Sequence, residues 1–116
     1  MAYGVKRFTV DGVALDITTA PSFSTRTKKF DPIEVIAGRP AHTVKRLMPF
    51  VEVECLWPEG RKLSDFQGKE DVLTQIETED GRTFYWNSSK EVSDSDNNPA
   101  EGKMTLRYES FETGEL

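Results

Sequence analysis

The sequence predicts an all-β domain of about six to seven antiparallel strands with one short helix, arranged as a β-sandwich or small barrel. Apolar and polar residues alternate along several short segments, which is typical of half-buried strands. Two Asp-Gly pairs stand between such segments and predict tight hairpins. With 116 residues, the chain is expected to form a single domain over residues 1–116.

The first hairpin is predicted in the segment VKRFTVDGVALDI, residues 5–17, with its turn at Asp11-Gly12. A two-residue turn fixes which residues face each other across the two strands. The resulting pairs are apolar on one face and oppositely charged on the other. They are Val10 with Val13, Phe8 with Leu15, and Arg7 with Asp16.

The second hairpin is predicted in QIETEDGRTFYWNSS, residues 75–89, with a two-residue turn at Asp80-Gly81. This register sets Ile76 opposite Tyr85 on the core face. It places Phe84 and Trp86 together on the opposite face, beside polar residues. Either a short helix around residues 63–66 or a neighbouring subunit is expected to cover these two aromatics.

Two further strands follow from alternation. In FVEVECLWPEG, residues 50–60, the apolar positions 51, 53, 55 and 57 alternate with Glu52 and Glu54, and Pro49 suggests a bend before them. In KMTLRYESF, residues 103–111, Met104, Leu106 and Tyr108 are expected to point inward.

Residues 18–40 lack this periodicity. They contain three prolines, a basic cluster (Arg26, Lys28, Lys29) and apolar pieces at Phe23, Phe30 and IEVI. A connection of this length is unusual in a compact domain and is often functional or mobile. We therefore expect either a mobile surface loop or an extended arm that orders against another surface.

Composition excludes several classes of protein. The net charge is −5 and the sequence pI is about 4.9, opposite to the balance of a protein that grips nucleic-acid phosphates. No apolar run approaches the roughly 20 residues of a membrane span, and the first residues, MAYGVKRFTVDG, have no signal-peptide pattern. The single cysteine fits a reducing cytoplasm.

The chemically reactive residues give no catalytic pattern, so we expect no enzyme activity, cofactor or metal. His42 is the only histidine and is interpreted as a polar surface residue, and Cys55 as a packed thiol. The run DSDNN resembles the start of a calcium loop, with Asp94, Asp96 and Asn98 at alternate positions. The later ligand positions then hold Pro99 and Thr105, so a solvated turn is expected instead.

The order of segments resembles a known family. The strand FVEVECLWPEG, a short Leu/Asp helix, the hairpin IETEDGRTFYWNSSKEV, an acidic Asp/Asn loop and EGKMTLRYES together resemble the tail tube proteins of contractile-tailed phages of the Mu-like type. The match covers roughly residues 50–110 with the hairpin at 5–17, whereas residues 18–46 depart from it and are more basic.

This resemblance implies a structural virion protein whose hexameric rings stack into the DNA conduit of a phage tail. It implies sheath, tape measure, baseplate and terminator proteins as partners, and a chain made in the bacterial host cytoplasm, with no membrane association. DNA would pass through the lumen without specific binding, which suits an acidic chain. The candidate lumen residues are Glu52, Glu54, Glu77 and Glu79, and the candidate subunit-interface residues are Phe84, Trp86, Phe23, Phe30, Arg26, Lys28 and Lys29.

Two alternatives stay open at this point. One is a related ring protein, such as a tail terminator or baseplate connector, or the inner-tube protein of a phage-derived injection device. The other is a small β-domain binding protein, or an enzyme that takes its catalytic residues from a partner.

Overall fold

The computed structural model describes residues 4–33, 38, 41–94, 97 and 99–116. These residues are nearly all β, as predicted, but the ten strands exceed the expected six to seven. The additional strands are short or belong to segments without alternation. The elements are β1 Val5–Val10, β2 Val13–Leu15, β3 Ser22–Ser24, β4 Lys28–Ile33, β5 Ala41–Arg46, β6 Phe50–Leu56, the 3-10 helix η1 Leu63–Asp65, β7 Val72–Thr78, β8 Thr83–Glu91, β9 Lys103–Glu109 and β10 Glu112–Glu115.

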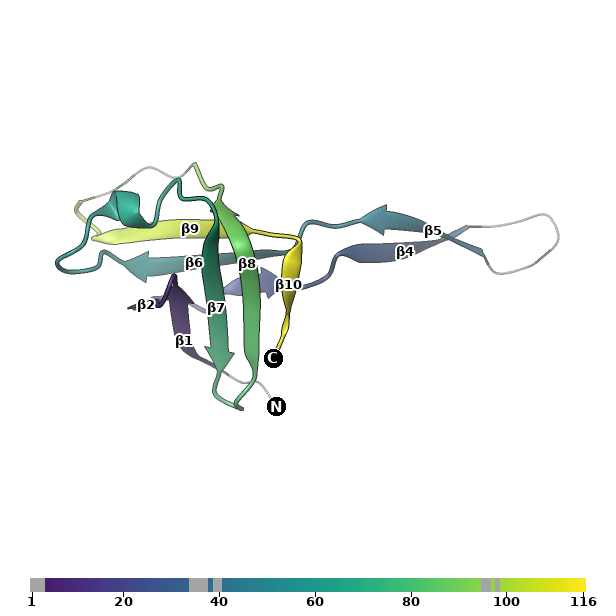
Figure 1. The fold of residues 1–116 in the computed structure, drawn as a ribbon, viewed down its shortest axis with the longest axis horizontal. Helices are drawn as coiled ribbons and strands as arrows, with labels where there is room; N and C mark the ends of the chain where they lie inside the picture. Colours follow the sequence, from purple (N-terminus) through teal and green to yellow (C-terminus); the bar gives the residue numbers. More distant parts are fainter. Residues whose placement is uncertain (1–3, 34–37, 39–40, 95–96, 98) are drawn as a thin grey trace.

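Eight of the strands form one antiparallel sheet in the order β2-β1-β7-β8-β9-β6-β3, with β10 paired to β8. After β2, Ile17 forms a β-bridge to Cys55 on β6. Because β6 lies next to β3 at the other end of the strand order, this bridge closes the sheet as in a small barrel. Figure 1 shows β6 and β9 crossing β7 and β8. The apolar core lies between these crossing strands and includes Phe8, Val53, Ile76, Trp86 and Leu106.

The first hairpin has the predicted register. Val10 pairs with Val13 and Phe8 with Leu15. Asp11 and Gly12 both have positive φ, 51° and 83°, as a two-residue type I′ turn requires. The expected Arg7–Asp16 pair lies beyond this ladder, and Arg7 instead pairs with Glu77 on β7.

The predicted register of the second hairpin is wrong by one residue. Ile76 pairs with Phe84, and Thr74 with Trp86. The loop is longer than predicted, because the Thr78 N–H donates to the Arg82 carbonyl at 2.8 Å and the Gly81 N–H to the Thr78 carbonyl at 3.1 Å. Gly81 has a φ of 90° and supplies the left-handed residue that closes such a three-residue loop.

The register shift exchanges the two faces of β8, because neighbouring strand residues point to opposite sides. Trp86 has an exposed fraction of 0% and belongs to the protein's own core. Phe84 packs against that core from a partly buried position. Tyr85, expected in the interior, lies on the other face and is half-buried.

The cover over Phe84 and Trp86 is β3, and not the short helix. The Phe23 ring lies 4.9 Å from Phe84 and 5.7 Å from Trp86, between ring centroids. The helix expected at 63–66 is a single 3-10 turn, and the Lys62 N–H donates to the Asp65 carboxylate there at 3.3 Å. Phe66 follows it, buried, and its carbonyl accepts a 2.7 Å hydrogen bond from the Tyr108 hydroxyl.

The alternation of buried and exposed residues predicted within residues 50–60 and 103–111 is confirmed. On β6, Val51, Val53 and Cys55 are buried, and on β9 the residues Met104, Leu106 and Tyr108 are buried. These two strands pair along their full lengths, from Phe50–Glu109 to Leu56–Lys103. They therefore provide the side of the core that faces β7 and β8.

The segment expected to be an arm has two parts. Residues 22–24 form β3 within the barrel, whereas β4 and β5 form a separate two-stranded hairpin. That hairpin extends away from the barrel (Figure 1), and the molecule measures 64 × 31 × 25 Å. The projecting arm is thus the β4–β5 hairpin, which begins at residue 28 and ends at residue 46 and is described over 28–33, 38 and 41–46, and not residues 18–40. Beyond Ile33, the rest of the IEVI piece lies outside the described residues.

Candidate assembly surfaces

The arm exposes apolar side chains on both of its faces. Phe30 on β4 pairs directly with Val44 on β5, so both side chains stand on one face. Their exposed fractions are 55% and 60%. The ammonium group of Lys28 lies 5.4 Å from the centre of the Phe30 ring. Ile33, on the opposite face, is also exposed.

The arm and the barrel carry opposite net charge. Residues 28–46 contain five Lys or Arg and two Asp or Glu, a net charge of +3. Since the whole chain is −5, the remainder is −8. The predicted basic residues Lys28 and Lys29 lie on β4, and Arg26 lies two residues before its start. Only one ion pair, Lys29 with Asp31 at 3.5 Å, joins charges within the described part of the arm.

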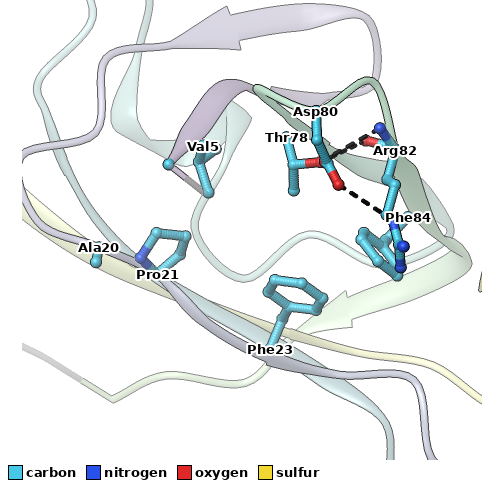
Figure 2. A pocket seen from close by; sticks show the side chains of 9 residues that line it. Val5, Ala20, Pro21, Phe23, Thr78, Asp80, Arg82 and Phe84 are labelled. Carbon is cyan, nitrogen blue, oxygen red and sulfur yellow. Dashed lines mark hydrogen bonds and ion pairs between the residues drawn. The ribbon is translucent and has the colours of Figure 1, made fainter. Parts of the chain in front are cut away.

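An apolar groove of about 410 Å³ opens where β1, β3 and the β7–β8 turn meet. Figure 2 shows Pro21 and Phe23 on one side, with Val5 and Phe84 on the other. Ala20 completes the wall beside Pro21. The groove exists because β3 places Phe23 against Phe84, and it therefore depends on the observed register of the second hairpin.

Two charged residues, Asp80 and Arg82, line this groove, and two more carboxylates, Glu79 and Glu115, lie next to its lining residues. Asp80 accepts a hydrogen bond from the Thr78 hydroxyl and an ion pair from the Arg82 guanidinium at 3.1 Å. These two interactions, the Thr78 hydrogen bond first, hold the pKa of the Asp80 carboxyl below its usual value. The same arginine lies 3.7 Å from Glu115, and Glu79 lies against Gly4, which also lines the groove.

The structure places three of the predicted interface aromatics together, though differently from the expectation. Trp86 is enclosed in the core, and its indole N–H donates to the Ser24 carbonyl at 3.3 Å. It is therefore not available to a neighbouring subunit, and this part of the prediction is corrected. Phe23 and Phe84 are only partly buried and form the groove wall. Phe30 lies on the arm.

The four candidate lumen residues do not form one acidic surface. Glu52 and Glu54 share the outward face of β6, where Arg107 lies 2.9 Å from Glu52 and Lys103 lies 3.6 Å from Glu54. Arg107 also lies over the Phe50 ring at 4.1 Å. Glu77 is on β7, a strand not adjacent to β6, and Lys6 lies 3.7 Å from it. Glu79 belongs to the β7–β8 turn.

Of the other reactive residues, His42 lies on the arm and Cys55 lies in the core. His42 is exposed on β5, opposite Pro32. Cys55 is buried, and burial, followed by the charges of Glu54 and Asp16, raises the pKa of its thiol to about 12. Of the calcium-like run, Asp96 and Asn98 lie outside the described residues. Within the described ranges, no group of three or more His, Cys, Asp or Glu is arranged to hold a metal ion.

Comparison with protein-family models and with curated proteins finds no match to this chain. Among the described residues, no helix has the length and apolar character needed to cross a membrane. The groove is the feature that sequence reasoning missed. Its walls come from four strands, β1, β3, β7 and β8, whose contact depends on long-range pairing, and Ala20 and Pro21 carry no periodic signal.

Proposed function

We propose that this chain is a structural virion protein: a self-assembling tail tube subunit whose hexameric rings stack into the DNA conduit of a phage tail, with a contractile sheath around it. One observation carries the proposal. A hairpin arm of net charge +3, with exposed Phe30 and Val44, projects from a barrel region of net charge −8. Such an arm makes few contacts within its own chain and is complementary in charge to another copy.

The segments that resemble tail tube proteins occupy the elements that build the barrel. They form β6, the η1 turn, the β7–β8 hairpin and β9. An acidic barrel also suits a conduit, because like charges repel DNA phosphates and allow the genome to slide. The proposal includes sheath, tape measure, baseplate and terminator proteins as partners, and a location in the phage tail.

The second candidate is a ring protein that does not stack, such as a tail terminator or baseplate connector, or else the inner-tube protein of an injection device. The same arm favours it, since an arm also joins subunits around one ring. The two candidates differ in the product of assembly: a terminator or connector forms single rings, whereas a tube subunit also forms long hollow tubes.

Electron microscopy of the purified protein at increasing concentration tests the proposal. We expect six-fold rings and hollow tubes. A protein that stays monomeric at every concentration and salt condition contradicts it, and single rings that never stack favour the second candidate.

A variant without the arm makes the test specific. The Leu47 N–H donates to the Thr27 carbonyl at 2.9 Å, so a short Gly-Ser linker can replace residues 28–46 without displacing the barrel. We expect this variant to keep its thermal midpoint within a few degrees and to form no assemblies. Deleting residues 18–40 is a poorer test, because it also removes Phe23 from Trp86. Tubes formed by the variant without residues 28–46 contradict the role given to the arm.

A further inference from the structure

We propose that the groove beside Phe23 and Phe84 is the receptor for the arm of a second copy of this chain, and that the Phe30–Val44 pair is the part of the arm that enters it. This inference rests on the proposed self-assembly and names the two surfaces that meet. The apolar character of both surfaces, their local charges and the direction of the arm support it.

The groove and the arm pair match in chemistry. Apolar side chains, including Phe23 and Phe84, form most of the groove wall, and its volume of about 410 Å³ is within the range typical of ligand-binding pockets. Phe30 and Val44 are exposed neighbours on one face of a narrow hairpin. Aromatic anchors that fill pockets typically dominate the affinity of protein interfaces.

The local charges are also complementary. Lys28 and Arg46 pair across the arm two residues from Phe30 and Val44, on the same face. Asp80 and Arg82 line the groove and pair with each other, while Glu79 beside Gly4 and Glu115 beside Arg82 add negative charge around its rim. An arm that enters the groove therefore brings two cations towards a rim with an excess of negative charge.

The direction of the arm makes the contact intermolecular. Within the described residues, β4 and β5 pair only with each other, and the hairpin points away from the barrel (Figure 1). An arm-to-groove contact is heterologous, because the two surfaces differ. Each copy would thus bind one neighbour by its arm and another by its groove, which produces a ring or a continuing stack.

Two variants test this assignment separately. Phe30→Ser removes the anchor from an exposed position of the arm, and Ala20→Trp fills the groove from an exposed position of its wall. Each is expected to weaken self-association by about 30-fold or more in analytical ultracentrifugation, the effect typical of losing an anchor residue. Ile33→Ser is the matched control: it removes an exposed apolar residue from the opposite face of the same arm, and we expect less than a 3-fold change.

Mixing the two defective variants gives the decisive result. The Phe30→Ser protein keeps an intact groove, and the Ala20→Trp protein keeps an intact arm. Each alone should stay monomeric, whereas an equimolar mixture should form a 1:1 complex that grows no further. A mixture that stays monomeric overturns the inference, as does an Ala20→Trp variant that assembles like the wild type.

Cross-linking gives a second measurement that does not depend on a bulky substitution. Under oxidising conditions, a chain with Ala20→Cys and Val44→Cys should form disulfide-linked dimers and higher oligomers. A chain with Ala20→Cys and Ile33→Cys should not. If the wild-type protein forms tubes and the groove variants assemble equally well, the groove is not the receptor, although the proposed function still stands. A wild-type chain that never assembles, or whose arm binds a 20-base-pair DNA duplex at physiological salt instead, refutes the receptor and the proposed function together.

Discussion

Phe23 lies with its ring nearly perpendicular to Trp86, at 82° and with 5.7 Å between the ring centroids. The two residues come from distant parts of the chain, and the adjacent Ser24 carbonyl accepts the indole N–H of the same tryptophan. The chain between the first hairpin and the arm is therefore part of the barrel. It closes the core over Trp86 on one side and forms the wall of the groove on the other.

We expect Phe23→Ala to destabilise the barrel by about 2–3 kcal/mol. This is less than the loss for a fully buried phenylalanine, because Phe23 is only partly buried. Urea unfolding followed by tryptophan fluorescence measures it. Phe30→Ala on the exposed arm is the matched control and should change the free energy of unfolding by less than about 0.5 kcal/mol. Equal losses in both variants would show that β3 does not cover Trp86.

The two hairpins show how far the sequence predicts this fold. Both contain Asp-Gly between strands, but the same dipeptide fits a two-residue loop and a three-residue loop closed by glycine. In the second hairpin the Thr78 hydroxyl bonds to Asp80 and lies 3.3 Å from the Arg82 carbonyl, which favours the longer loop. Alternation alone does not contain this information, and a shift of one residue moved Trp86 from the expected interface to the core.

The site was less predictable than the fold. The inward residues of β6 and β9 follow from alternation, because one face of each strand is buried over its whole length. The groove instead depends on Phe23 meeting Phe84, a long-range contact with no local signal. Strand β10 was missed because it is short and contains Gly114, which carries little strand propensity.

A buried hydrogen-bond chain at the irregularity of β7–β8 gives the second prediction. The hydroxyls of Thr74 and Ser89 lie 2.9 Å apart, and the Ser89 hydroxyl donates to the Val72 carbonyl at 2.7 Å. Thr74 is therefore the donor to Ser89. Ser89→Ala leaves both the Thr74 hydroxyl and the Val72 carbonyl without this partner, and we expect a loss of about 2–3 kcal/mol.

Thr74→Val is the comparison for that loss. It removes one donor but leaves the Ser89 bond to Val72 in place, so we expect about 1 kcal/mol. Chemical denaturation of both variants shows which of them loses more unfolding free energy. A larger loss for Thr74→Val than for Ser89→Ala would mean that the direction of the hydrogen bonds is reversed.

Gly114 and Tyr85 give the third prediction. They pair across β10 and β8, and a Cβ at Gly114 would lie 2.8 Å from the Tyr85 hydroxyl oxygen. Gly114→Ala should therefore cost about 1 kcal/mol by displacing the half-buried tyrosine. In a Tyr85→Ala background the same change should be neutral or stabilising, because alanine suits a strand better than glycine. A double-mutant cycle measures this reversal, and additive effects would contradict the contact.

Alkaline pH is expected to destabilise the protein through two buried acids. Burial raises the pKa of the Cys55 thiol from 9.0 to about 12, and it also raises the pKa of Tyr108 above its usual value of 10.0. Both groups lose their protons more readily when the chain is unfolded. Their contribution to stability is complete below about pH 9 and is lost as the pH rises from there through the folded pKa values.

The expected slope is up to about 1.4 kcal/mol of unfolding free energy per pH unit for each group. Urea titrations at pH 8, 9, 10 and 11 measure it, with Cys55→Ala as the comparison. That variant is less stable at every pH because it leaves a cavity, but its decline should begin near pH 10, where only Tyr108 contributes. A thiol reagent at pH 8 should label Cys55 only as fast as the protein unfolds, since the buried thiol is neutral there. Rapid labelling, or stability that stays level to pH 11, would show that the Cys55 side chain is not enclosed in the core.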